Sequence, residues 1–278
     1  MGSRVDRLSP LLRITLIGFA GLALAAGGLL FIGATETEDW FSWTIEPPLS
    51  AAALGAFYWG AFVLLATGAT ASGWRGVRPI ALPVLAIAIS LLVITLIHLD
   101  PFDLDSLFGV FWLCAYIAAP PLLVAGIVLE RRRDPPGHPP RVSGRVRPPL
   151  GSALRATLAI EGGVMLAVSA IMLLAPDTAA DLWPWALTPL TSRALGSFVL
   201  GVALVALLVA REEEIELFRG TATALVGLAA LQLLAVALHT PDLGDDDLAT
   251  GIYLGFVGVV LATGLYALSR AASAFARS

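Results

Sequence analysis

The chain has 278 residues, of which 58% are hydrophobic and only 14% are charged, with a formal net charge of −4. Soluble globular proteins are about half apolar and about a quarter charged, so this composition indicates a membrane protein. All 17 basic residues are Arg, and the lack of Lys excludes a retinal or pyridoxal phosphate Schiff base and a Walker A nucleotide site.

Apolar segments of about 20 residues, long enough to cross a bilayer as helices, follow one another along the chain. No convincing small-residue cleavage site follows the first segment, so we expect it to be retained as a helix. The sequence predicts an all-α integral membrane protein with eight transmembrane helices. They are expected near 11–33, 51–71, 79–98, 107–129, 152–175, 193–210, 218–239 and 249–269.

The arginines predict the orientation of these helices. If the N-terminus is cytoplasmic, every Arg except Arg193 falls on the cytoplasmic side, where short loops rich in positive charge normally stay. More than half of the 21 acidic residues fall on the other side, including Asp100, Asp103 and Asp242. We therefore expect a multi-pass plasma-membrane protein with both termini in the cytoplasm and an acidic outer face.

The two halves of the chain are similar to each other in sequence. With an offset of about 141 residues, DWFSWTIEPPLSAAALG (39–55) aligns with DLWPWALTPLTSRALG (181–196). Each half has an even number of spans, which predicts two parallel four-helix repeats related by a pseudo-two-fold axis along the membrane normal. The predicted domains are a first repeat at 1–130, a cytoplasmic linker rich in Arg and Pro at 131–150, and a second repeat at 151–278.

Four tryptophans precede the second helix of the two halves: Trp40, Trp43, Trp183 and Trp185. Trp is common at membrane interfaces, because its ring is apolar and its N–H can be hydrated. We expect these residues to be interfacial anchors. The alternative is that they form a lid over an outer cavity.

Glycines recur at matching places in the predicted helices. In lipid, small residues allow the close helix contacts that replace a hydrophobic driving force. We expect such contacts at Gly55 and Gly60, at the matching Gly196 and Gly201, and at Gly18, Gly21, Gly251 and Gly255.

His98 and His239 occupy equivalent positions at the outer ends of the third helix of each half. Imidazole suits zinc, copper, nickel or iron, and two histidines can also ligate haem. Alternatively, each histidine caps its helix, where a cation is favourable. If the two-fold axis brings these ends together, His98 and His239 lie on opposite walls of an acidic outward-facing cavity with Asp100, Asp103 and Asp242.

Glu161 is a carboxylate well inside a predicted span, where an ionisable group is costly and suggests a functional site. Its alternative role is a polar contact, for example with Arg155. Gln232 lies on the same helix face as His239 and would extend a polar path inward from the outer site.

The chain contains no HExxH, GxSxG or nucleotide-binding motif, so an enzymatic activity stays open. The two four-helix halves resemble the architecture of haem A synthases. Those proteins carry paired histidines within each half, whereas this chain has one histidine at the outer end of each.

Two functions remain open. The first is a carrier, channel or binding protein for a small solute, cation or lipid, which would use the acidic outer cavity, Glu161 and Gln232. The second is a membrane redox protein that depends on haem or a divalent metal bound by His98 and His239. The lack of cofactor motifs favours the first function. We expect the lipid bilayer as the surroundings and no nucleic-acid partner.

The predicted orientation can be tested with reporter fusions. Fusions after residues 140 and 214 should report the cytoplasm, and fusions near 38, 103, 179 and 244 the exterior, because arginines stay inside. Paired enzymatic reporters, one active on each side of the membrane, provide the measurement. An exterior signal at 140 would contradict the two-repeat prediction, because it requires an odd number of spans before the linker.

Overall fold

A computed structural model of the chain describes residues 8–71, 73–133, 150–211 and 215–275. Eight helices in these ranges are long and apolar enough to span a membrane, and the described residues contain no β-sheet. The prediction of an all-helical fold with eight helices able to span a membrane is therefore confirmed, and this fold is compatible with a multi-pass membrane protein. Most of the expected linker, residues 134–149, lies outside the described part of the chain.

The long helices fall close to the predicted segments. In the first half they are α1 (Pro10–Ile32), α3 (Pro48–Thr70), α4 (Gly73–Ile97) and α5 (Leu107–Arg133). In the second half they are α6 (Ser152–Leu174), α8 (Pro189–Arg211), α9 (Ile215–Leu238) and α10 (Asp247–Phe275). The short elements are α2 (Thr37–Trp40), α7 (Pro176–Leu182) and the 3-10 turn η1 (Thr240–Asp242).

Local sequence accounts for several of the helix starts. Pro48 and Pro189 stand at the first positions of α3 and α8, where the missing N–H of proline costs nothing. Gly73 has a φ of 79°, a conformation that favours glycine, and it begins α4 directly after α3. Helix α4 therefore begins before residue 79, where the apolar segment had predicted its start. The first turns of α4 contain polar residues and so lay outside that segment.

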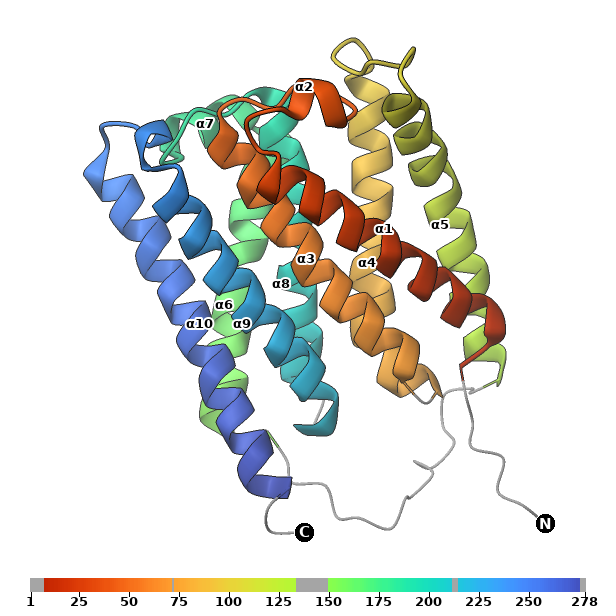
Figure 1. The fold of residues 1–278 in the computed structure, drawn as a ribbon. Coiled ribbons are helices and arrows are strands. Elements are labelled where there is room, and N and C mark those ends of the chain that lie inside the picture. Colours follow the sequence, from red (N-terminus) through yellow and green to blue (C-terminus); the bar gives the residue numbers. More distant parts are fainter. Residues whose placement is uncertain (1–7, 72, 134–149, 212–214, 276–278) are drawn as a thin grey trace, which may run out of the picture.

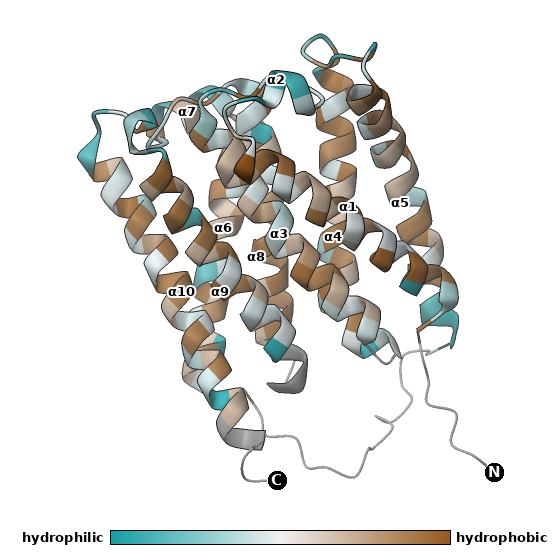
Figure 2. Cartoon of the chain, in the orientation of Figure 1, coloured by the Kyte–Doolittle hydropathy of each residue, from teal (hydrophilic) through white to brown (hydrophobic). Residues whose placement is uncertain are grey.

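The connections between the long helices lie at the two ends of the bundle. Figure 1 shows α2 and α7 at one end, with the first turn of α1 and the last turn of α10 at the other. Hydrophobic residues run along the helices, and hydrophilic residues gather at both ends and in the connections (Figure 2). This distribution is typical of helices whose middle portions lie in hydrocarbon.

The two halves of the chain interlock. Helix α3 packs against α1 of its own half and against α9 of the other, while α8 packs against α6 and α4. In their most apolar stretches, 61% of α3 and 67% of α8 is buried, against 22% of α10. Helices α3 and α8 therefore form the centre of the bundle, and α10 lies at its edge.

Glycines allow the closest of these approaches. A Cβ added at Gly55 would lie 2.6 Å from the backbone N of Phe31 in α1, and one at Gly196 would lie 2.8 Å from Cβ of Met172 in α6. Gly60 similarly faces Leu228 of α9, and Gly201 faces Ile87 of α4. The predicted role of these four glycines in helix packing is confirmed.

The same prediction is wrong for four other glycines. A Cβ added to any of them would meet no atom within 4 Å, because these residues lie on outer helix surfaces with open space beside them. They are Gly18, Gly21, Gly251 and Gly255.

Gly55→Ala should destabilise the protein, because its added methyl group must displace the backbone of α1 at Phe31. Overpacking of this kind costs about 1–3 kcal/mol. Gly18→Ala is the matched control, since its methyl group meets open space and should leave the stability unchanged or slightly higher. Thermal unfolding in detergent measures both variants. Equal melting temperatures for the two would contradict the close contact.

Candidate functional site

Two large pockets lie between the helices, one mostly in each half of the chain. The α1–α5 pocket has a volume of 450 Å³ and is lined by α1 to α5, with Phe198 of α8. The α6–α10 pocket has a volume of 280 Å³ and is lined by α6 to α10, with Ala53 and Phe57 of α3. Both volumes are near the lower end of the range of small-molecule sites, about 300–1,000 Å³.

The rims of both pockets include exposed apolar side chains of the outer helices. Phe111 is 54% exposed at the rim of the α1–α5 pocket, and Val164 and Ile252 are 45% and 64% exposed at the rim of the α6–α10 pocket. Exposed apolar residues on a helix that spans a membrane would contact hydrocarbon, so lipid chains would lie next to these parts of the pocket walls.

Aromatic rings gather at the end of the α1–α5 pocket that lies near α2. Trp43 is only 4% exposed, and its ring centroid lies 4.7 Å from that of Phe41 and 5.0 Å from those of Phe102 and Trp112. Trp40, in contrast, is 47% exposed and lines the pocket. Trp43 is therefore part of a buried cluster, whereas Trp40 stays at the surface.

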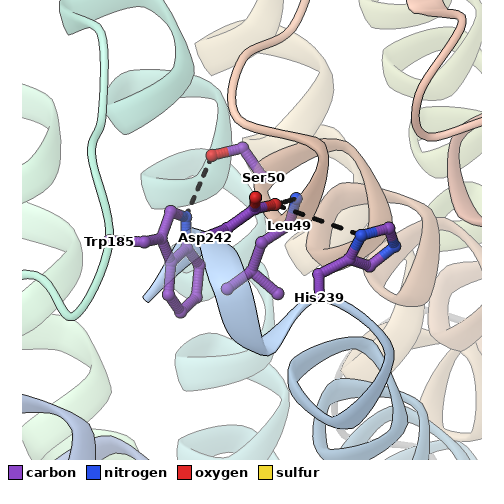
Figure 3. Close-up of polar contacts among 5 residues, drawn as sticks. All are labelled: Leu49, Ser50, Trp185, His239 and Asp242. Carbon is purple, nitrogen blue, oxygen red and sulfur yellow. Dashed lines mark hydrogen bonds and ion pairs between the residues drawn. The ribbon is translucent and has the colours of Figure 1, made fainter. Parts of the chain in front are cut away.

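A second aromatic cluster lies at the end of the α6–α10 pocket that lies near α7. Trp183, Trp185 and Tyr253 all line this pocket, and their ring centroids are 5.2 to 5.6 Å apart in edge-to-face arrangements. Trp185 is 2% exposed, and its Nε1 donates to Ser50 Oγ of the other half at 2.9 Å (Figure 3). This hydrogen bond ties the connection after α7 to the start of α3.

Few polar groups line the pockets, and most of them bond one another. In the α1–α5 pocket, the hydroxyl groups of Tyr58 and Tyr116 are 2.9 Å apart. In the α6–α10 pocket, Tyr253 Oη donates to Gln232 Oε1 at 2.9 Å, and Gln232 Nε2 donates to the carbonyl of Ala53 at 3.0 Å. Gln232, a predicted site residue, thus lies on a pocket wall and also bridges the two halves.

His98 lies beside the start of α8. Arg193 Nη1 donates to His98 Nε2 at 2.6 Å, and Arg193 Nε donates to the carbonyl of Leu173 at 3.1 Å. Arginine can only donate, so the imidazole accepts through an unprotonated nitrogen. Burial lowers the pKa of His98 below its ordinary value, and the charge of Arg193 lowers it further.

His239 lies beside the start of α3 instead. Its Nδ1 is 4.0 Å from Asp242 Oδ2, which also accepts from the backbone N of Leu49 at 2.8 Å (Figure 3). Asp242 therefore satisfies a free N–H at the first turn of a helix of the other half.

The two histidines thus have separate partners, and the upper ends of α4 and α9 lie on opposite sides of the start of α3 in Figure 1. Within the described residues, no three His, Cys, Asp or Glu side chains are grouped closely enough to hold a metal ion. Neither histidine lines either of the two pockets. A haem or metal site at His98 and His239 stays a prediction.

The predicted acidic residues also lie away from the two pockets. Asp100 and Asp103 are exposed in the connection after α4, and Asp242 is half-buried at η1. Neither pocket is lined by an acidic residue. The structure therefore places the outer acids around the ends of the helices rather than on the walls of these two spaces.

Glu161 is buried between α6 and α10. Thr263 Oγ1 donates to Glu161 Oε1 at 2.6 Å. Arg155 binds the carbonyl of Ala210 at 3.0 Å instead of pairing with this carboxyl group. Glu161 lies one helical turn from Val164, and Thr263 one turn from Val260, and both of these valines line the α6–α10 pocket.

Several aromatic residues that line the pockets were not predicted from the sequence. Tyr58, Tyr116 and Trp112 line the α1–α5 pocket, and Tyr253 lines the other. One available signal was that Trp112 and Tyr253 match under the offset of about 141 residues. A single aromatic residue in an apolar helix carries no pattern that separates a pocket wall from a lipid-facing surface.

No protein-family model, curated protein or solved structure matches this chain.

The His98–Arg193 hydrogen bond should make stability depend on pH. Because the pKa of His98 is lowered on folding, the unfolded chain binds a proton more readily, and stability falls as the pH drops below about 6.5. In His98→Gln, an amide oxygen can accept from Arg193 without titrating, so the loss between pH 7.5 and 5 should be smaller. Thermal unfolding between pH 7.5 and 5 measures this loss of stability in both proteins. Parallel pH profiles for wild type and variant would contradict the assignment.

Proposed function

We propose that this protein binds the apolar chain of a lipid-type molecule in each of its two pockets. The observation that carries the proposal is the pair of apolar spaces whose rims would contact lipid chains and whose walls carry clusters of aromatic rings. Of the small solutes, cations and lipids that the sequence left open, a lipid fits these walls best. A molecule dissolved in the membrane can enter from the side without crossing water.

The chemistry of the walls argues against a cation as the occupant of these two pockets. An ion that leaves water needs charged or polar ligands around it, and here the lining is almost entirely aliphatic and aromatic. The polar lining groups that do occur, such as Gln232 and Tyr253, are already bonded to each other. The separate partners of His98 and His239 likewise give no support to a redox function.

The proposal includes the pseudo-two-fold relation between the halves, which several contacts support. The rings of Phe57 and Phe198, which match in the repeat, stack on each other with centroids 5.7 Å apart, as residues next to a two-fold axis would. The close contact of Gly55 with Phe31 matches that of Gly196 with Met172. Two related pockets follow from such a duplication.

The tryptophans fit the lid role in this proposal better than the anchor role. Trp43 and Trp185 are both buried within aromatic clusters at the outer ends of the pockets. An interfacial anchor normally keeps its N–H in water, whereas Trp185 donates to Ser50 inside the protein.

Glu161 lies beyond the inner end of the α6–α10 pocket, and we include it in the proposal as a polar group that a bound chain approaches.

The proposal also places the protein in the plasma membrane with the aromatic clusters at the outer face. The arginine distribution supports this orientation, because α2 and α7 lie at the end opposite most of the described arginines. The bound molecule then comes from the outer half of the bilayer.

Filling a pocket should remove lipid binding at that pocket alone. Val168→Trp places an indole in the α6–α10 pocket, and Ala26→Trp does the same in the α1–α5 pocket, because both side chains are half-buried on the pocket walls. We expect affinity at the filled pocket to fall at least ~10-fold, which corresponds to about 1.4 kcal/mol. Photo-crosslinking with a phosphatidylcholine that carries a diazirine on its chain, followed by peptide mapping, measures each pocket separately.

Leu166→Trp and Leu24→Trp are the matched controls, since these residues lie on the same helices, 39% and 48% exposed, and do not line the pockets. In both control variants, the photo-reactive lipid should crosslink to the two pockets as strongly as in the wild type. Crosslinks spread evenly over the outer surface of the protein, with no change in any variant, would show that the pockets do not bind lipid.

A further inference from the structure

Arg193 is the one arginine that the sequence predicts on the side of the membrane opposite the other arginines. It lies half-buried near the start of α8 and lines neither of the two pockets. The matching residue of the first half is Ala52, so this guanidinium group has no counterpart in the repeat. A charge at this place therefore needs an explanation of its own.

Both groups that Arg193 contacts are uncharged. Its Nε donates to the carbonyl of Leu173 at 3.1 Å, and its Nη1 donates to His98 Nε2 at 2.6 Å, so the imidazole accepts through an unprotonated nitrogen. Within the described residues, Arg193 forms no ion pair with a carboxylate. A charge that is partly removed from water is costly unless an opposite charge compensates it.

Arg193 also keeps free hydrogen-bond donors. Arginine carries five N–H donors, and the two contacts use one on Nε and one on Nη1. Nη2 has no partner among the described residues, and it is not a buried atom. The planar fork of donors in a guanidinium group suits the oxygens of a phosphate or a carboxylate.

The position of the guanidinium group along the helices indicates which oxyanion is available. Arg193 lies about one turn into α8, and side chains on a helix lean toward its N-terminus, which here is the end of the bundle that carries α7 (Figure 1). Its two partners lie at the same level, since Leu173 is next to the last residue of α6 and His98 directly follows α4.

This level corresponds to the headgroups of a bilayer. Helix α8 has 23 residues and is about 35 Å long, slightly more than the ~30 Å of hydrocarbon that it would cross. The ends of α8 therefore reach the polar region, where phospholipids carry their phosphate groups. The phosphate of a neighbouring phospholipid would supply the negative charge that the protein does not.

We infer that Arg193 binds the phosphate of a phospholipid headgroup at the place where the start of α8 meets the ends of α4 and α6. Inorganic phosphate has the same oxygens, but a phospholipid is already held at this level by its chains, so one arginine is enough to bind it. The site is separate from the two pockets and goes beyond the proposed function.

The test titrates the full-length protein, in an uncharged detergent, with a phosphatidylcholine that carries a diazirine on its choline group. Crosslinks to peptides around His98, Leu173 and Arg193 report the site. Arg193→Gln should lower the apparent affinity there about tenfold or more, as expected for a hydrogen bond between charged groups. Arg155→Gln is the matched control, because Arg155 also donates to a backbone carbonyl but lies near the opposite end of α6. It should leave these crosslinks unchanged.

A second comparison needs no variant. A diacylglycerol with the same chains and with the diazirine on its glycerol hydroxyl lacks the phosphate, and it should label the same peptides about tenfold less. Excess inorganic phosphate should leave the labelling by phosphatidylcholine unchanged, because the free anion has no chains to hold it at this level.

Three results would overturn the inference: equal labelling by the two lipid probes, unchanged labelling in Arg193→Gln, or displacement of the lipid by inorganic phosphate. The last result would mean that the site binds a free anion rather than a lipid. A phosphatidylcholine with the diazirine at the end of its chain reports the two pockets separately. Failure of the pockets to label would contradict the proposed function and leave this inference in place.

Discussion

Helices in a bilayer gain little by burying apolar side chains against each other, because the lipid around them is equally apolar. Close contact has to hold this bundle together, and glycines on α3 and α8 make that contact possible. Gly55 lets α3 approach the backbone of α1, and Gly196 lets α8 approach α6. One turn or so further along, Gly60 and Gly201 receive side chains of α9 and α4 from the opposite half. The two halves therefore interlock at α3 and α8, while α5 and α10 pack on the helices around this centre.

The pockets are a consequence of the same arrangement. Packing concentrated on α3 and α8 leaves the outer helices in looser contact, and α10 is buried over only 22% of its most apolar stretch. The spaces lie where the first and last helices of each half flank the centre, and aromatic rings line them near α2 and α7. Large, rigid rings such as Trp43, Trp112 and Trp185 fill volume there with little loss of conformational freedom.

Polar contacts between the halves occur at the end of the bundle that carries α2 and α7. His98 accepts from Arg193 of α8, and Asp242 accepts from the first turn of α3, so each half holds the start of the central helix of the other. Ser90 and Ser197, 2.8 Å apart, add a contact between α4 and α8 within the bundle. The His98–Arg193 contact needs an unprotonated imidazole nitrogen, so it is lost when His98 is protonated.

Length and hydropathy alone predicted the eight spans, because a helix in hydrocarbon must be apolar over its whole crossing, whatever its neighbours are. The similarity between the two halves also predicted close contacts at the glycines of α3 and α8, since small residues at matching helix positions are typical of such contacts. The same reasoning failed at Gly18 and Gly251, which are equally small but face open space.

Only the tertiary structure decided which residues meet. The sequence suggested that His98 and His239 face one cavity, but it did not show their neighbours: His98 lies beside Arg193 of the opposite half, and His239 lies beside Asp242 of its own half. The aromatic residues of the pocket walls within the spans, Tyr58, Trp112, Tyr116 and Tyr253, had no pattern that separated them from lipid-facing residues, since a helix that is apolar on all sides does not reveal which side faces lipid. The sequence by itself determined the number and length of the spans and the glycines that permit close packing. The contacts between halves, and with them the pockets, depend on the angles at which those helices cross, which no local pattern of residues encodes.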